Sequence, residues 1–215
     1  MTKVKICCIQ SIAEAQMAID FGAYAIGLVS KMPSGPGVIS DEKIREIAKW
    51  SKGKIKTVLL IAKQNVNELI EQYRFCETDI IQLVDYQEME TYQILKKEFP
   101  LVELMQVIHV IDDNSIMEAI DVSNFVDIIL LDSGNPNLQA KELGGTGRTH
   151  NWELSKQIVD KVNVQVFLAG GLNPENVSQA VAQVNPYGVD LCSGLRVEGN
   201  LIEKELKSFM KNLNK

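Results

Sequence analysis

The chain has few of the residues that build metal centres and disulfide frameworks. Its 215 residues include two histidines and four cysteines, and the cysteines, at positions 7, 8, 76 and 192, form no Cys-x-x-Cys pair. No His-Glu-x-x-His motif and no Cys/His cluster occurs, which argues against a metal site. Because neighbours such as Cys7 and Cys8 seldom bridge each other, we expect reduced thiols in a cytoplasmic enzyme.

Long apolar runs and dense positive charge are also missing. No hydrophobic run is long enough to span a bilayer, and the segment after Met1 lacks the apolar core of a secretion signal, so no membrane association is expected. The net charge is −6 and no Lys/Arg-rich run occurs, which argues against a nucleic-acid partner. A small anionic substrate fits the charge, because local backbone dipoles can outweigh it.

What the chain does have is a regular alternation of apolar, β-branched runs with amphipathic helical segments. The content of hydrophobic residues, 46%, suits one domain with a substantial core. The runs that predict strands are residues 3–9, 24–30, 54–62, 79–84, 101–111, 126–132, 164–169 and 187–192. Helical spacing is clearest in residues 11–21, 41–50, 174–184 and 201–213, with Ser11 and Asn173 as N-caps.

Strict alternation of strands and helices requires parallel pairing and right-handed crossovers. Eight such units in 215 residues predict an α/β fold of the (β/α)8 TIM-barrel type, as a single domain over residues 1–215. The alternative is an open doubly wound sheet, although no Gly-x-Gly-x-x-Gly motif follows the first strand.

Two consecutive predicted strands near the end of the chain run into glycine. One is followed by Gly170 and Gly171, and the other by Ser193 and Gly194. Glycine at the C-terminal tip of a parallel strand leaves backbone N–H groups open to a phosphate, and the last two strands of an eight-fold barrel are the usual place for such a site. The sequence therefore predicts a small phosphorylated substrate.

Two side chains at strand ends are candidates for acid–base chemistry. Side-chain alternation along the first strand places Cys7 on the same face as Lys5 and Ile9, with Cys8 on the other face. Asp132 ends an apolar strand, where partial desolvation raises a carboxyl pKa, and nearby cations would lower that of a thiol. The alternatives are a small buried hydrophobe at Cys7 and a cap for the following loop at Asp132.

The glycine-rich segment around Gly145, Thr146 and Arg148 suggests a mobile lid whose cation covers the substrate, or else a flexible surface loop. Gln82, near the end of the fourth predicted strand, could bind a sugar hydroxyl or simply fill the barrel.

Taken together, these motifs resemble the phosphoribosylanthranilate isomerase family of tryptophan biosynthesis, nearly end to end. The similar segments are Lys5-Ile6-Cys7, residues 22–27, Leu131-Asp132-Ser133, Gly144-Gly145-Thr146-Gly147 with Trp152, residues 168–176 and residues 188–194. The resemblance implies a (β/α)8 barrel and an Amadori rearrangement that needs no cofactor. It further implies that Asp132 is the general acid, that Cys7 is the general base, and that the amides of residues 170, 171, 193 and 194 hold the phosphate.

Three departures from the family pattern cluster at the aromatic end of the substrate. Gly37 stands where the family usually has an arginine for the anthranilate carboxylate, Cys8 replaces a glycine, and Val84-Asp85 replace His-Gly; beside Cys8, Gln10 also replaces a threonine. They suggest as alternatives an isomerase of another phosphosugar or phosphoribosyl amine, or a non-catalytic phosphometabolite-binding protein. Lys31 or Arg148 could pair the carboxylate instead. The sequence is compatible with a monomer or a homodimer.

Overall fold

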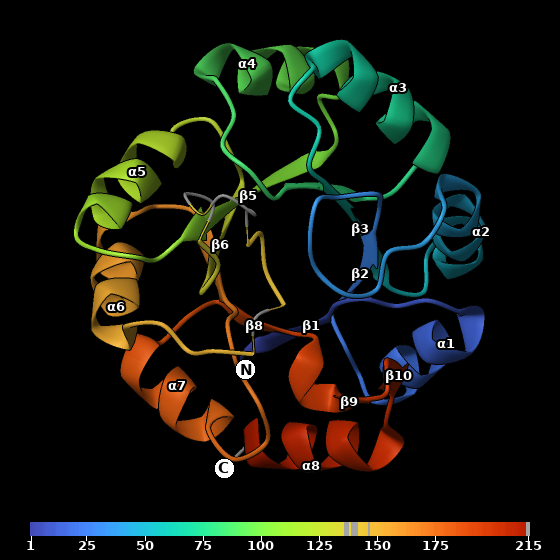
Figure 1. The fold of residues 1–215 in the computed structure, drawn as a ribbon, viewed down its shortest axis with the longest axis vertical. Coiled ribbons are helices and arrows are strands. Elements are labelled where there is room, and N and C mark those ends of the chain that lie inside the picture. The colour runs from blue at the N-terminus through green and yellow to red at the C-terminus, as the bar shows by residue number, and fades with distance from the viewer. Residues whose placement is uncertain (136–137, 139–141, 146, 214–215) are drawn as a thin grey trace.

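The structure, a computed structural model, describes residues 1–135, 138, 142–145 and 147–213. Among these residues, eight parallel strands form a closed barrel in sequential order, with β8 paired to β1 (Figure 1). The strands are β1 (Lys3–Ile6), β2 (Ala25–Val29), β3 (Lys56–Ile61), β4 (Ile80–Leu83), β5 (Glu103–His109), β6 (Ile128–Asp132), β7 (Gln165–Leu168) and β8 (Gly188–Leu191). The predicted barrel is confirmed, and the open sheet is not formed.

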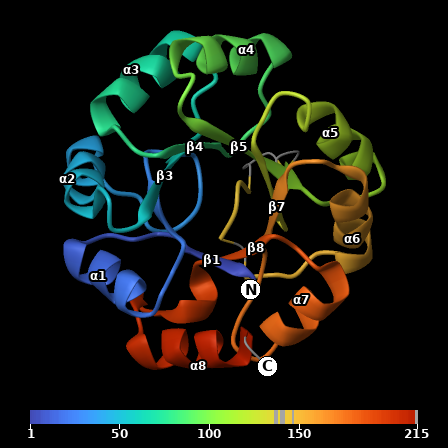
Figure 2. The same ribbon diagram turned by 180° about the vertical axis from the view of Figure 1, so that it is seen from behind.

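Helices surround the barrel as an outer ring, which is clear from both sides (Figures 1 and 2). They are α1 (Ile12–Asp20), α2 (Asp41–Ser51), α3 (Val66–Cys76), α4 (Met89–Glu98), α5 (Asn114–Val122), α6 (Trp152–Lys161), α7 (Val177–Val184) and α8 (Glu203–Leu213). No helix in the described part of the chain has the length and apolarity needed to cross a membrane.

Alternation along the strands divides the core into two layers. Leu59 and Ile61 point outward into the layer between strands and helices, whereas Val58 and Leu60 point into the barrel. Phe167 fills the barrel interior, and Gly188 leaves room for its ring, because a Cβ at residue 188 would contact the ring atoms. Burial of each large apolar side chain contributes roughly 1.5–3 kcal/mol, so the packed interior fixes the strand ends that carry the site.

The helix starts test the capping predictions. Ser11 caps α1 as predicted, since its Oγ accepts a hydrogen bond from the Glu14 N–H at 3.2 Å. In contrast, α7 begins at Val177 rather than at residue 174, because the Asn173 side chain accepts the N–H groups of residues 175 and 176 and closes a separate turn. Likewise α8 begins at Glu203, because Leu201 pairs with Arg196 in a short hairpin of β9 (Arg196–Val197) and β10 (Asn200–Leu201).

The first strand is shorter than predicted, and its side chains do not alternate to the end. Cys8 has a left-handed backbone with φ 65°, so the regular strand ends at Ile6. Cys8 therefore joins Cys7 in the barrel-side layer, and Ile9 turns into the helix-facing layer. The predicted faces of Cys8 and Ile9 were wrong, because alternation holds only while the backbone stays extended.

Candidate active site

A cavity opens at the C-terminal ends of the barrel strands. Cys7 and Asp132 both line it, as do Gln82 and Asp190. Its rim comes from the loops after β2, β6, β7 and β8, and includes Ser34, Gly35, Pro36, Gly144, Gly145, Gly170, Gly171 and Ser193. The cavity is thus lined by a thiol, two carboxyl groups and glycine-rich backbone.

Cys7 lies just beyond the end of β1 and is 5% exposed. Its N–H donates to the Leu191 carbonyl at 2.7 Å, which joins β1 to β8 at this level. Gly27 on β2 makes room for the sulfur, because a Cβ there would lie 2.8 Å from Sγ. Burial raises the pKa of the Cys7 thiol to about 11, although the charge of Lys5 acts to lower it. The expected lowering of this pKa by neighbouring cations is therefore outweighed by desolvation.

Asp132 ends β6 and is 7% exposed. Its Oδ1 accepts the Ser133 N–H at 2.8 Å, while a Cβ on Gly144 would lie 2.8 Å from Oδ2. One oxygen thus caps the following loop and the other faces the backbone that covers the cavity. Burial raises the pKa of Asp132 to about 6, against the lowering effect of the Ser133 N–H. A carboxyl with this pKa can deliver a proton near neutral pH.

The two phosphate-loop glycines lie in conformations that favour glycine. Gly170 and Gly171 have φ values of 79° and 62° and line the cavity, and Ser193 lines it from the loop after β8. Successive backbone groups in such conformations can form a concave site for an anion. Gly194 is not among the described residues that line the cavity, and a Cβ on it would contact the Leu172 carbonyl. Gly194 therefore serves close packing of the two loops.

The glycine-rich segment after β6 contributes to the cavity unevenly. Gly145 lines the cavity, and Thr146 lies outside the described residues. The Arg148 guanidinium forms an ion pair with Glu142 and is not among the described lining residues, in contrast to the cation expected over the substrate. Gln82 is buried at the cavity, and its Oε1 has no hydrogen-bond partner in the part of the chain that the structure describes, so this oxygen can accept a substrate hydroxyl.

A pair of charged side chains beneath Cys7 was not singled out as functional from the sequence. Lys5 and Asp190 are directly paired in the register of β1 and β8, and their Nζ and Oδ1 atoms are 2.9 Å apart. The Lys5 side chain is fully buried. A lysine and an aspartate inside otherwise apolar strands were the available signal, and the register that brings them together depends on barrel closure.

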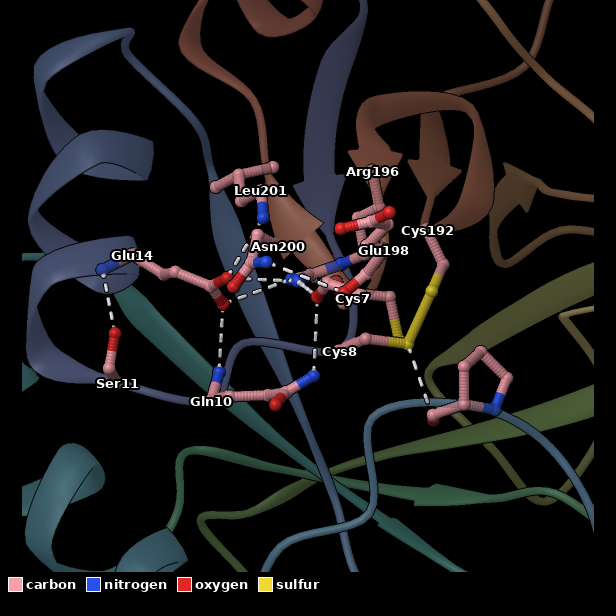
Figure 3. Close-up of polar contacts among 12 residues, drawn as sticks. Cys7, Cys8, Gln10, Ser11, Glu14, Cys192, Arg196, Glu198, Asn200 and Leu201 are labelled. Carbon is pink, nitrogen blue, oxygen red and sulfur yellow. Dashed lines mark hydrogen bonds and ion pairs between the residues drawn. A yellow bond between two sulfur atoms is a disulfide. The ribbon is translucent and has the colours of Figure 1, made fainter.

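Cys8 and Cys192 form a disulfide across the junction of the first and last strands (Figure 3). Their Cα atoms are 6.0 Å apart although 184 residues separate them. Figure 3 also shows Arg196, which donates to Glu14 and to the Cys7 carbonyl. The expectation of reduced thiols was wrong for these two cysteines, because closure of the barrel juxtaposes residues with no informative spacing. Cys7 and Cys76 are free thiols.

Two of the departures from the family pattern are in direct contact. Gly37 has φ 78°, and a Cβ on it would lie 2.5 Å from the Cys8 Cβ. The Cys8 Sγ also lies 3.6 Å from the Pro36 carbonyl oxygen. The Cys8 side chain thus occupies the space that a side chain at residue 37 would enter, so we expect substitutions at the two positions to be coupled.

The chain was compared with known proteins. Residues 4–212 match the family described as PRAI, N-(5'phosphoribosyl)anthranilate (PRA) isomerase. The N-(5'-phosphoribosyl)anthranilate isomerase of Aquifex aeolicus (strain VF5) is 34% identical over 216 residues, which cover 98% of each chain. The protein of that name from Methanocella arvoryzae (strain DSM 22066 / NBRC 105507 / MRE50) is 31% identical over 198 residues, covering 92% of this chain and 91% of the relative.

Solved structures agree with this similarity. Phosphoribosyl anthranilate isomerase from Thermotoga maritima matches with a TM-score of 0.84 at 27% identity, over 100% of this chain and 99% of that one. Another isomerase structure, in complex with reduced 1-(o-carboxyphenylamino)-1-deoxyribulose 5-phosphate, matches with a TM-score of 0.82 at 25% identity and the same coverage. This chain therefore belongs to the N-(5'-phosphoribosyl)anthranilate isomerase family.

Proposed function

We propose that this chain is an aldose–ketose isomerase that converts N-(5'-phosphoribosyl)anthranilate to the corresponding carboxyphenylamino-deoxyribulose phosphate. The observation that carries the proposal is that the Cys7 thiol and the Asp132 carboxyl line one cavity whose rim includes the glycine backbone of residues 170 and 171. Family membership and the product analogue bound by a structural neighbour support this substrate. The chemistry needs no redox partner, since the rearrangement moves protons within one substrate, and no cofactor is proposed.

In this proposal the substrate phosphate binds the amides at residues 170, 171 and 193, which line the cavity, and the ribose lies over the centre of the barrel. Protonated Asp132 donates to the furanose ring oxygen, and the ring opens to a Schiff base. Cys7, as the thiolate, then takes the C2 proton, and the resulting enolamine tautomerises to the ketone. The pKa of about 6 at Asp132 suits the acid step, whereas the thiol, with a pKa of about 11, needs a specific means of losing its proton.

The anthranilate carboxylate would meet the rim formed by Ser34, Gly35 and Pro36. No lysine or arginine lines the cavity in the described part of the chain. Loss of a charge-assisted hydrogen bond costs roughly 1.5–3 kcal/mol, so we expect a higher KM than in family members that carry the arginine. The named relatives favour the anthranilate substrate over a different phosphosugar.

We propose that the enzyme is located in the cytoplasm. We also propose that it is a monomer or a homodimer. A structural neighbour from Thermotoga maritima is described as monomers generated from a dimeric isomerase, so at least one relative forms a dimer.

Complementation tests the proposed function in cells. We expect the wild-type gene to restore growth without tryptophan to an auxotroph that lacks this isomerase, and Cys7→Ala at equal expression to fail. Growth with neither gene would reject the proposed substrate, and growth with both would reject the role of Cys7.

A further inference from the structure

Lys5 is a fully buried cation with two candidate anionic partners. Asp190 faces it from β8, with Nζ and Oδ1 2.9 Å apart, and Cys7 lies two residues further along the chain, just beyond the end of β1 and in the barrel-side layer. Neither Nζ nor Oδ1 has a hydrogen-bond partner of ordinary geometry among the described residues. The ammonium therefore has N–H groups that are not committed to Asp190 alone.

We infer that Lys5 holds one negative charge in the barrel, and that this charge exchanges between the Asp190 carboxylate and the Cys7 thiolate. In the resting state Asp190 carries the charge and Cys7 is a thiol. In the active state Cys7 is the thiolate and Asp190 is protonated. Lys5 and Asp190 are thus positioning residues that act through Cys7, and only the use of the thiolate as a base rests on the proposed function.

The exchange is balanced within the protein. Lys5 passes one ammonium proton to an Asp190 oxygen and takes the proton of the Cys7 S–H in return. The sum is one proton moved from sulfur to carboxylate, with the ammonium restored and no proton released to solvent. The net charge of the three groups is zero before and after the exchange.

Burial explains why this route is favourable. Loss of the Cys7 proton to solvent would leave two anions beside one cation in a desolvated interior, which is costly. Internal exchange keeps one anion and one cation throughout. The other charged groups that face the trio are Asp132 on β6 and Arg196 on β9. Burial raises the pKa of Asp190 as well as that of Cys7, so neither group holds a negative charge here as easily as it would in water.

The test is the alkylation of Cys7 by iodoacetamide in the full chain, without substrate and without reductant, with the label located by mass spectrometry. At about pH 7, Asp190→Asn should speed the alkylation of Cys7 by about tenfold or more, because Cys7 becomes the only anionic partner of Lys5. Lys5→Met should slow it by a similar factor. Cys76, a fully buried free thiol on α3, serves as the internal control and should stay unlabelled in every variant that remains folded.

Faster alkylation of Cys7 in Asp190→Asn together with slower alkylation in Lys5→Met would support the inference. A barrel merely loosened by the substitutions would instead speed alkylation in both variants. Equal directions, or an unchanged rate in Asp190→Asn, would overturn it. If Lys5→Met fails to fold because it leaves Asp190 unpaired, Lys5→Met/Asp190→Asn takes its place and should react at least tenfold more slowly than Asp190→Asn. Because the readout needs no turnover, its failure is distinguishable from failure of the proposed function.

Discussion

The phosphate end and the aromatic end of the cavity differ in how their side chains and backbone are used. At the phosphate end, Gly170 and Gly171 keep left-handed backbone conformations and face the cavity. At the aromatic end, Gly37 packs against Cys8, which is itself bound to Cys192. The first region depends on backbone geometry that single residues determine. The second depends on contacts between side chains of different loops, and one of these contacts, the Cys8–Cys192 disulfide, spans the junction of β8 and β1. One end therefore matches the family pattern, while at the other end the departures at residues 8 and 37 lie in contact with each other.

The largest effect is expected from substitution of the proposed general acid. Asp132→Asn should lower kcat/KM by about 10²–10⁴-fold, the usual value of a positioned general acid. In the wild type, kcat/KM should fall as the pH rises through about 6, because Asp132 loses its proton while internal exchange keeps the thiolate population constant. The variant should lack this fall. A wild-type profile that stays level from about 6 to about 11 would instead mean that Cys7 releases its proton to solvent.

The next-largest effect is expected at the aromatic end, where one substitution introduces a steric conflict and a second substitution relieves it. Gly37→Arg alone should reduce activity, because its Cβ would lie 2.5 Å from that of Cys8. Cys8→Gly/Gly37→Arg should lower KM for the anthranilate substrate by about tenfold or more relative to Cys8→Gly, since a charge-assisted hydrogen bond is regained. The measurement is a double-mutant cycle on kcat/KM.

Cys8→Gly also removes the disulfide, so Cys192→Ser is the matched control for that loss. If the two substitutions at residues 8 and 37 proved simply additive, the coupled account of this end would be wrong.

The smallest effect concerns the phosphate end. Gly171→Ala would place a Cβ 2.5 Å from the Arg148 carbonyl carbon and force alanine into a φ of 62°. Such strain costs about 1–2 kcal/mol, so we expect KM to rise by about tenfold with a smaller change in kcat. Gly22→Ala is the control, because its φ is 75° and a Cβ there meets nothing within 4 Å. It should lower stability and leave KM unchanged, and equal KM changes in both variants would contradict a local role for Gly171.

The sequence could predict most elements of the fold, but it could not predict several contacts of the site. The apolar runs that alternate with helical segments predicted all eight strands. The position of Asp132 at the end of such a run predicted that its carboxyl is buried. The left-handed turn at Cys8 could not be predicted, because the side-chain pattern of residues 3–9 does not show where the extended backbone ends. The Cys8–Cys192 bridge and the Lys5–Asp190 pair depend on the register of β1 with β8. The ion pair of Arg148 with Glu142 likewise depends on how one loop folds back on itself.

The most direct measurement is turnover by the purified protein on freshly prepared N-(5'-phosphoribosyl)anthranilate, followed as loss of the anthranilate-type fluorescence. We predict that the wild type removes the fluorescence in proportion to enzyme concentration and that Cys7→Ala, at the same concentration and equally folded, does not. Fluorescence that persists at high wild-type concentration would contradict the proposed substrate, and fluorescence that Cys7→Ala removes as fast as the wild type would contradict the role of Cys7 as the base.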